Sequence, residues 1–315
     1  MTQIASPTKR SPRIAIDPGA APWVVERVRE GGATIVEPNE AEALVWSSPY
    51  NTAGLRTILA DNAQIGWVQL PFAGIENWLA EGFCRDGRRW TCGKGVYAEP
   101  VAEHVLALAL AGMRHIGHYA QARSWGEKLG TCLLDAEVLC LGGGGITESL
   151  LRLLQPFGCK VTVLRNRPGS SEFAERPRQV GPDTLHSELP RAALVVIALA
   201  LTPETTGLIG APELLRMRPD AWLVNVGRGA HVVTDALVDA LREERIGGAA
   251  LDVTDPEPLP EGHPLWGLPN CIITPHTANT PDMAKGPLGA RIRENVRRFT
   301  AGEPLIGLVD PHLGY

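Results

Sequence analysis

Short apolar segments rich in β-branched residues alternate with helical segments along nearly the whole chain. Residues 13–16 form the first such segment, and an amphipathic stretch at 22–30 follows, which starts with proline and ends at two glycines. This alternation is typical of parallel sheets covered by helices, so the sequence predicts an α/β fold. Further strands are expected at residues 33–36, 43–46, 66–70, 137–141, 160–164, 194–199, 222–226, 248–253 and 271–274, and further helices at 55–59, 99–113 and 291–299.

The length of 315 residues is about twice the usual domain size, which favours two domains. We predict two Rossmann-like or flavodoxin-like lobes, each with a parallel sheet, and an active-site cleft between them. Residues 1–100 and 285–315 are expected to form one lobe, and residues 101–284 the other. The amphipathic helix at 291–299 is expected to pack back on the first lobe.

Composition argues against several classes of partner. The 30 Lys and Arg against 35 Asp and Glu give a net charge of −5, which does not favour nucleic-acid binding. The longest apolar run, at 192–201, is far shorter than the ~20 residues of a membrane span, so no membrane partner is expected. Residues 1–12 lack the apolar stretch of a secretory signal, and the six cysteines form no Cys-x-x-Cys pair. These features indicate a cytoplasmic protein.

A glycine turn follows the predicted strand at 137–141 and precedes a predicted helix. Glycines let backbone N–H groups approach a pyrophosphate at the positive end of a helix, where a side chain would collide. We therefore predict a dinucleotide site at Gly142, Gly144, Gly145 and Ile146. The fingerprint is imperfect, because Thr147 stands where a third glycine is usual.

The cofactor is predicted to be NADP, with NAD as the alternative. An Asp or Glu that would bind the ribose of NAD is missing after the strand at 160–164, where the sequence instead reads Arg165, Asn166 and Arg167. Two arginines could hold a 2′-phosphate through charge-assisted hydrogen bonds. The alternative interpretation is a solvated loop with two surface arginines.

Three polar side chains follow three predicted strands, where side chains of a parallel sheet converge. Arg228 follows the strand at 222–226, Glu257 follows 248–253, and His276 follows 271–274. Imidazole can exchange a proton near neutral pH, and a carboxylate beside it can fix its tautomer. A guanidinium can grip a substrate carboxylate in a two-pronged way. The set fits hydride transfer at a secondary alcohol or its ketone.

Arg228 and His276 lie within motifs, and Glu257 lies after one, that resemble the D-isomer-specific 2-hydroxyacid dehydrogenase family from about residue 65 to 285. The motifs are Leu-Thr-Pro-Glu-Thr at 201–205, Met-Arg-Pro-Asp-Ala at 217–221, Asn-Val-Gly-Arg-Gly at 225–229, Ala-Leu-Asp-Val at 250–253, and Leu-Pro-Asn at 268–270 with Thr-Pro-His at 274–276. The resemblance implies a nicotinamide cofactor in a dinucleotide-binding domain at 101–284 and a substrate (catalytic) domain in the other lobe. It implies that Arg228 binds substrate, that Glu257 is the partner of the histidine, and that His276 is the acid/base and also contacts substrate.

The same resemblance implies further contacts. Backbone N–H groups at Ala73 and Gly74 would hold the substrate carboxylate, and the Val-Ala-Glu segment at 101–103 implies a homodimer. Additional cofactor contacts are expected at Leu199, Thr205, Val226, Gly227, Asp252 and Ala278. No metal site is expected, because His115 and His118 lack a third ligand at a useful spacing. Trp125 and Trp266 are interpreted as core residues rather than as part of a pocket or a dimer interface.

The predicted function is hydride transfer between NAD(P) and a small D-2-hydroxyacid or 2-oxoacid, with NADPH-dependent reduction of glyoxylate or hydroxypyruvate favoured by resemblance. One alternative is an NAD-dependent D-3-phosphoglycerate dehydrogenase, which needs cations near the far end of its substrate. The sequence leaves open whether His231, Lys285 or Arg291 reach that place. No additional regulatory domain is expected. A second alternative is a dinucleotide-sensing binding protein that resembles the C-terminal-binding-protein corepressors.

Overall fold

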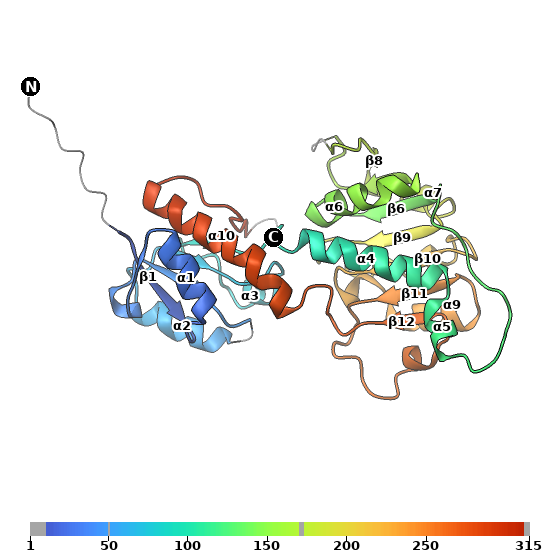
Figure 1. The fold of residues 1–315 in the computed structure, drawn as a ribbon, viewed down its shortest axis with the longest axis horizontal. Helices are drawn as coiled ribbons and strands as arrows, with labels where there is room; N and C mark the ends of the chain where they lie inside the picture. Colours follow the sequence, from blue (N-terminus) through green and yellow to red (C-terminus); the bar gives the residue numbers. More distant parts are fainter. Residues whose placement is uncertain (1–10, 50, 170–172, 312–315) are drawn as a thin grey trace, which may run out of the picture. The chain divides into compact units, whose positions relative to one another are not determined.

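The computed structural model describes residues 11–49, 51–169 and 173–311, and the chain forms two compact units (Figure 1). The first unit comprises residues 1–97 and 281–315, and the second comprises residues 98–280. The sequence predicts these boundaries at 100/101 and 284/285. Residues 1–10, most of the segment tested above for a secretory signal, lie outside the described residues.

The first unit contains a five-stranded parallel sheet in the order β2-β1-β3-β4-β5, which is the order of flavodoxin-like folds. Its strands are β1 (Arg13–Asp17), β2 (Thr34–Ile35), β3 (Ala43–Trp46), β4 (Trp67–Gln69) and β5 (Arg89–Thr91). Its helices are α1 (Pro22–Glu30), α2 (Thr52–Asp61), α3 (Glu76–Ala80) and α10 (Pro281–Ala301), with a 3-10 turn, η1, at Pro38–Glu40.

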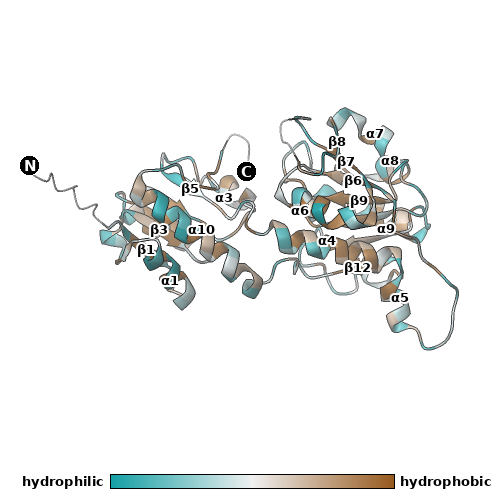
Figure 2. Ribbon diagram, turned by 45° about the horizontal axis from the view of Figure 1, so that its top comes forward, coloured by the Kyte–Doolittle hydropathy of each residue, from teal (hydrophilic) through white to brown (hydrophobic). Residues whose placement is uncertain are grey.

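Helix α10 returns the end of the chain to the first sheet. Ile292 and Val296 pack with α1 in one apolar cluster, and Figure 2 shows the mixed hydrophilic and hydrophobic colouring of this amphipathic helix. The fully buried Asn295 amide donates to Gln69 Oε1 (2.9 Å), which also accepts from Thr91 Oγ1 (2.9 Å). Strands β4 and β5 are therefore joined to α10 by a buried polar network.

The second unit contains a seven-stranded parallel sheet in the order β12-β11-β10-β9-β6-β7-β8. The direction of strand addition reverses at β6, as in Rossmann folds, where ligands bind beyond the carboxyl ends of the strands. The strands are β6 (Glu137–Leu141), β7 (Lys160–Leu164), β8 (Arg178–Val180), β9 (Leu194–Ile197), β10 (Trp222–Asn225), β11 (Gly248–Leu251) and β12 (Cys271–Ile273). The α/β class with two parallel sheets is confirmed.

Helices of the second unit cover both faces of this sheet. Helix α4 packs along α6 and on β10 and β11, and Gly112 of α4 makes room for the ring of Trp222, which a Cβ would approach to 2.3 Å. The helices are α4 (Ala98–Met113), α5 (Ile116–Gln121), α6 (Gly145–Leu154), α7 (Leu185–Glu188), α8 (Ala211–Leu214) and α9 (Thr234–Arg242). Short 3-10 turns are η2 (Gln155–Phe157), η3 (Pro182–Thr184), η4 (Gly229–His231) and η5 (Pro264–Gly267).

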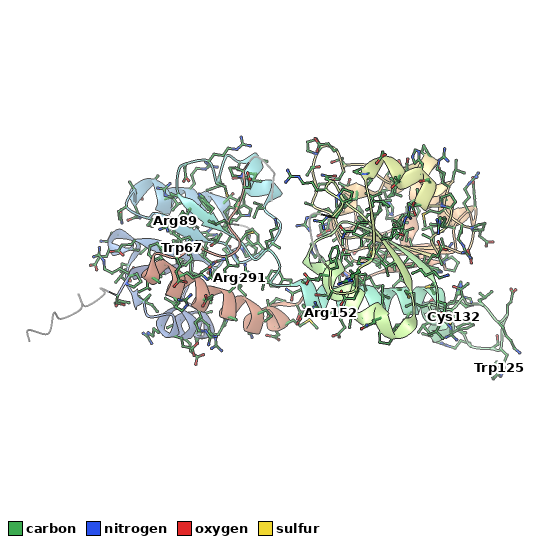
Figure 3. The ribbon with its side chains drawn as sticks, turned by 90° about the horizontal axis from the view of Figure 1, so that it is seen from above. Trp67, Arg89, Trp125, Cys132, Arg152 and Arg291 are labelled. Atoms are coloured by element: carbon green, nitrogen blue, oxygen red, sulfur yellow. The ribbon has the colours of Figure 1, made fainter. Side chains whose placement is uncertain are left out.

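The placement of two tryptophans in the core was wrong. Trp125 is 102% exposed in the segment that follows α5, and Figure 3 shows it at the outer end of that segment. Trp266 is 52% exposed, and its indole N–H donates to Pro260 O. Large aromatic side chains are usually buried, so such exposure indicates another role for the segment around Trp125. Within the described part of the chain, no helix is long and apolar enough to span a bilayer.

Candidate active site

The glycine turn joins β6 to α6 and leaves space beside its backbone. Gly142 has φ +111°, and a Cβ there would lie 2.4 Å from Ala198 O, directly after the neighbouring strand β9. Gly144 is exposed and caps α6, and a Cβ at this position would meet nothing within 4 Å. Thr147 Oγ1 donates to Gly142 O (2.7 Å), which ties the first turn of α6 to the glycine turn. The N-terminus of α6 thus faces open space bordered by glycines, which suits a pyrophosphate.

Arg165 lies against this turn. The N–H of Gly142 donates to Leu164 O (2.9 Å), so the turn and the end of β7 are adjacent. A Cβ at Gly143 would come within 3.0 Å of Arg165 Nε, and the guanidinium carbon lies 5.7 Å from the centre of the Phe173 ring. The side chain is therefore packed in place rather than extended into solvent.

One nitrogen of Arg165 is ready for a ligand. Its Nη1 is buried and has no hydrogen-bond partner among the described residues. A buried guanidinium N–H without an acceptor is costly, and a phosphate oxygen would satisfy it. Asn166 and Arg167 are both exposed. The residues present at this position therefore fit a dinucleotide that carries a 2′-phosphate.

The structure places Arg228, Glu257 and His276 after β10, β11 and β12, which are neighbours in the sheet. Because these strands are parallel, the three side chains start from the same edge. His276 Nδ1 donates to Glu257 Oε1 at 2.7 Å, and both side chains are about half exposed. Among the described residues, His276 Nε2 makes no hydrogen bond, so this nitrogen remains available for proton exchange with a substrate.

Asp252 organises the turn that carries His276. Its backbone carbonyl accepts from the N–H of His276 (2.9 Å), a residue with φ +52°. Its carboxylate accepts from Thr274 Oγ1 (2.6 Å) and from the N–H groups of Thr277 (2.8 Å) and Ala278 (3.1 Å). Three of the predicted residues, Asp252, His276 and Ala278, are thus brought together in one turn.

Asp252 is held as a carboxylate in a buried place. Burial alone would raise its pKa, but hydrogen bonds from His104, Thr274 and two backbone N–H groups outweigh burial and lower the pKa. The ring of His104 on α4 lies 3.0 Å from Thr274 Oγ1 and 3.4 Å from Asp252 Oδ1. The turn is therefore supported from α4 as well as from the sheet.

The backbone of Arg228 is held on both sides by side chains. Its N–H donates to His231 Nδ1 (3.0 Å), and its carbonyl accepts from Asn225 Nδ2 (2.9 Å). The guanidinium donates to Gly227 O (2.7 Å). Val226 is buried below this segment. The direction of the arginine is consequently fixed at the backbone.

The loop after β9 contains the predicted cofactor residues Leu199 and Thr205. Leu199 is partly buried and packs against the apolar core. Thr205 Oγ1 donates to Ala200 O (2.9 Å) and accepts from the N–H of Thr202 (2.8 Å). Both residues lie next to the glycine turn in the sheet order, because β9 pairs with β6.

In the first unit, the loop after β4 contains Ala73 and Gly74. It is held by the N–H of Gly93, which donates to Phe72 O (2.7 Å), and by Tyr97, whose hydroxyl donates to Pro71 O. Ala73 is exposed and Gly74 is partly exposed. Among the described residues, their N–H groups donate no hydrogen bond, as a backbone anion site requires.

All three groups considered for a distal substrate phosphate have protein partners. His231 is fully buried, and both of its ring nitrogens have protein partners. Arg291 donates to the carbonyls of Cys92 and Lys94 in the first unit. Lys285 pairs with Asp282 on α10.

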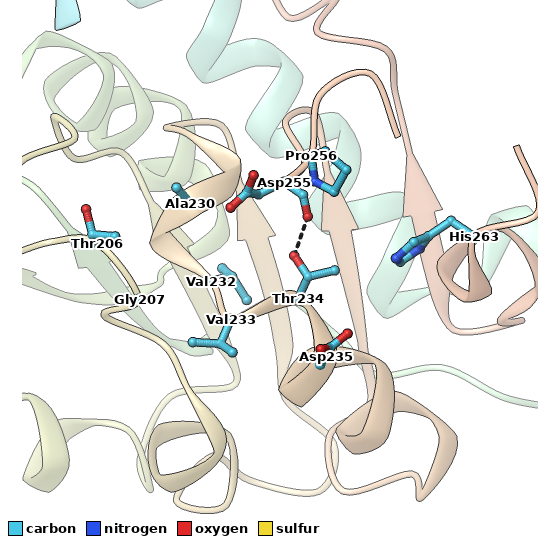
Figure 4. A pocket seen from close by; sticks show the side chains of 10 residues that line it. All are labelled: Thr206, Gly207, Ala230, Val232, Val233, Thr234, Asp235, Asp255, Pro256 and His263. Carbon is cyan, nitrogen blue, oxygen red and sulfur yellow. Dashed lines mark hydrogen bonds between the residues drawn. The ribbon is translucent and has the colours of Figure 1, made fainter. Parts of the chain in front are cut away.

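A cavity of about 440 Å³ lies beside the start of α9 (Figure 4). It is lined by Thr206, Gly207, Ala230, Val232, Val233, Thr234, Asp235, Asp255, Pro256 and His263. None of the residues predicted to bind cofactor or substrate belongs to this lining, so the cavity is separate from the predicted set.

The residues that support the site are not predicted by the sequence. Asn225 lies inside the Asn-Val-Gly-Arg-Gly motif, which indicates no separate role for it, and Thr274 lies at the end of the predicted strand 271–274. His104 lies on α4, 148 positions before Asp252 in sequence, and no local pattern links the two.

Comparisons with known proteins agree with this fold and identify the family. Residues 106–278 match the model of the D-isomer specific 2-hydroxyacid dehydrogenase, NAD binding domain. An uncharacterized protein of Corynebacterium melassecola is 40% identical over 257 residues, 80% of this chain and 84% of that protein. A glyoxylate/hydroxypyruvate reductase A of Photorhabdus laumondii is 29% identical and covers 87% of each chain. A crystal structure of a D-isomer specific 2-hydroxyacid dehydrogenase from Xanthobacter autotrophicus Py2, in complex with NADPH and MES, superposes with a TM-score of 0.82 at 26% identity, over 97% of this chain and 100% of that one.

The two parallel-sheet units together with these matches define an NAD(P)-dependent oxidoreductase. The chain belongs to the D-isomer-specific 2-hydroxyacid dehydrogenase family.

Proposed function

We propose that this protein reduces glyoxylate or hydroxypyruvate to the 2-hydroxyacid and prefers NADPH. The observation that carries the proposal is the His276–Glu257 pair at 2.7 Å, at the same sheet edge as Arg228. The printed names of relatives support the substrate class, since the Photorhabdus protein is a glyoxylate/hydroxypyruvate reductase. The small 2-oxoacid also suits a single carboxylate-binding arginine.

In this proposal, Arg228 binds the substrate carboxylate with two N–H groups, together with the backbone N–H groups of Ala73 and Gly74. His276 donates the proton from Nε2 to the carbonyl oxygen as the alcohol forms, and Glu257 keeps the ring in the orientation that this transfer needs. The reduced nicotinamide supplies the hydride. The cofactor contacts are proposed at Gly142, Gly144, Gly145, Ile146, Leu199, Thr205, Val226, Gly227, Asp252 and Ala278.

The preference for NADPH rests on Arg165, with Asn166 and Arg167 beside it. The buried Nη1 of Arg165 lacks an acceptor among the described residues and lies in a side chain packed on the glycine turn. A 2′-phosphate would supply that acceptor. The relative from Xanthobacter was crystallised with NADPH, which agrees with this preference.

A rate panel tests the proposal. Loss of NADPH absorbance is followed with glyoxylate, hydroxypyruvate, pyruvate and 3-phosphohydroxypyruvate, and every acid is repeated with NADH. We expect the highest kcat/KM with NADPH and glyoxylate or hydroxypyruvate. Preference for the phosphorylated acid with NADH would favour a phosphoglycerate dehydrogenase. Dinucleotide binding without turnover of any acid would contradict the proposal and favour a binding protein of the corepressor type.

We further propose that the protein is a homodimer that works in the reducing cytoplasm. Ile116 of α5 and Trp125 and Leu134 in the segment after it are each more than half exposed. A second copy of the chain would cover them.

The proposed compartment agrees with the state of the cysteines. All six cysteines are free, and burial raises the pKa of the Cys140 and Cys271 thiols to about 12, so neither forms thiolate readily.

A further inference from the structure

We propose that His231 is a positioning residue that links the loop after β9 to the substrate arginine, and this inference rests on the proposed role of Arg228. The imidazole lies between two segments that are far apart in sequence. Its Nδ1 accepts from the N–H of Arg228 (3.0 Å), and its Nε2 lies 3.3 Å from Ala200 O. The ring is fully buried, so it acts through these contacts and touches no substrate.

The two contacts define the state of the ring. Nδ1 accepts from a backbone N–H and therefore carries no proton, so the proton of the neutral ring is on Nε2, where it is donated to the Ala200 carbonyl. Every ring nitrogen of His231 thus has a fixed task. Phenylalanine could fill the space but could perform neither task, which explains why a polar residue occupies a fully buried position.

The space for the ring is provided by a glycine. A Cβ at Gly227 would lie 3.0 Å from both His231 Nδ1 and Cε1, so a larger residue would push the imidazole away. Gly227 directly precedes Arg228, and its carbonyl accepts from the arginine side chain. The imidazole, the glycine and the arginine therefore form one packed unit, in which a shift of the ring moves the backbone from which the guanidinium starts.

The other end of the link is a carbonyl shared with a predicted cofactor residue. Ala200 O accepts from Thr205 Oγ1 (2.9 Å) as well as from His231. A dinucleotide that orders the loop at 199–205 would therefore fix the Ala200 carbonyl, and through His231 the backbone of Arg228. The expected consequence is that dinucleotide binding raises the affinity for the substrate carboxylate.

Two substitutions separate the two hydrogen bonds. In His231→Asn, the amide oxygen takes the place of Nδ1 and keeps the bond to Arg228, while the link to Ala200 is lost. In His231→Gln, the amide nitrogen takes the place of Nε2 and keeps the link to Ala200, while the bond to Arg228 is lost. Glu188→Gln is the control, because Glu188 is a buried residue of the same unit that pairs with Arg178, away from this network.

The readout is calorimetric binding of oxalate, an unreactive dicarboxylate, with and without NADP⁺, together with KM for glyoxylate. In the wild type we expect NADP⁺ to tighten oxalate binding. Both histidine variants should lose most of this effect, and only His231→Gln should also raise KM for glyoxylate, by about tenfold for one lost hydrogen bond. The control should keep both properties.

Unchanged coupling in both variants, or the same losses in Glu188→Gln, would overturn the role of His231. Both outcomes concern the variants and are observed while the wild-type protein still reduces glyoxylate. They can therefore be distinguished from a failure of the proposed function. That failure would appear as a wild-type protein that binds NADP⁺ and oxalate but reduces none of the 2-oxoacids.

Discussion

Replacing Arg165 by alanine should remove most of the preference for NADPH. The guanidinium is packed between the glycine turn and Phe173, and its buried Nη1 has no acceptor among the described residues. A phosphate would meet a donor whose position is already fixed, so little side-chain entropy is lost on binding. A hydrogen bond to a charged group contributes about 1.5 to 3 kcal/mol, which corresponds to a rise of about 10- to 100-fold in KM for NADPH.

Arg167 gives an internal comparison, because it follows the same strand but is exposed. Exposed ion pairs contribute about 0 to 1 kcal/mol, so Arg167→Ala should raise KM for NADPH by no more than about fivefold. Neither variant should change KM for NADH, which has no 2′-phosphate. Arg242→Ala, at the exposed end of α9, is the matched control for loss of one positive charge.

The assay is KM for NADPH and NADH at saturating glyoxylate and fixed ionic strength, supported by fluorescence titration of NADPH without substrate. Ionic strength is held constant because salt weakens the exposed contact more than the packed one. Equal effects of Arg165→Ala on NADPH and NADH would refute the reasoning. A larger effect at Arg167 than at Arg165 would refute the argument from packing.

Three further predictions concern the turn, the acid/base pair and the dimer. Asp252→Asn should lower the free energy of unfolding by about 3 kcal/mol at pH 7, because the amide cannot accept every hydrogen bond of the carboxylate. The pKa of Asp252 is lowered in the folded protein, so the extra stability of the wild type is present above the pKa of the unfolded state and is lost as the pH falls through the pKa of the folded state. Urea titrations should therefore show that the difference in free energy of unfolding between wild type and variant becomes smaller from pH 7 towards acid. A difference that stays constant with pH would contradict this. Glu257→Gln should lower kcat by about 10- to 100-fold with little change in KM for glyoxylate, because the imidazole of His276 loses its charged partner at 2.7 Å. An unchanged kcat in stopped-flow assays would show that Glu257 has no part in the mechanism. If the wild type is a dimer, Trp125→Glu should shift it towards monomer in sedimentation velocity. The melting temperature of the isolated chain should not fall, since the indole is fully exposed in one copy. A wild-type protein that sediments as a monomer would exclude the dimer.

The sequence predicted elements well where the periodicity was strong. Residues 43–46, 137–141 and 160–164 are strands with the predicted bounds, and α1 spans the predicted 22–30, because β-branched runs and flanking glycines mark their ends. Strands β5 and β8 were missed, since each has only three residues and its pairing partner decides its conformation.

The same division applies to the candidate site. Arg228, Glu257 and His276 could be singled out because each follows a predicted strand, and the structure places them after three neighbouring strands. Helix α10 begins ten residues earlier than predicted, with Pro287 inside it, because packing on α1 outweighs the local preference of proline for a helix start. The contacts of His104 with Thr274 and of His231 with Ala200 were beyond reach, because only the fold brings these partners together.

The buried Asn295 amide has a consequence for synthesis of the chain. It joins strands β4 and β5 to a helix that is translated only after the whole second unit. The first sheet is therefore translated early but lacks one of its covering layers until α10 has been made, whereas the second unit is uninterrupted and has every strand it needs by residue 280. The second unit should therefore complete its folding before the first unit, although it is translated later. A chain truncated before Asn295 should leave the first sheet incompletely folded, while the second unit still reaches its native structure.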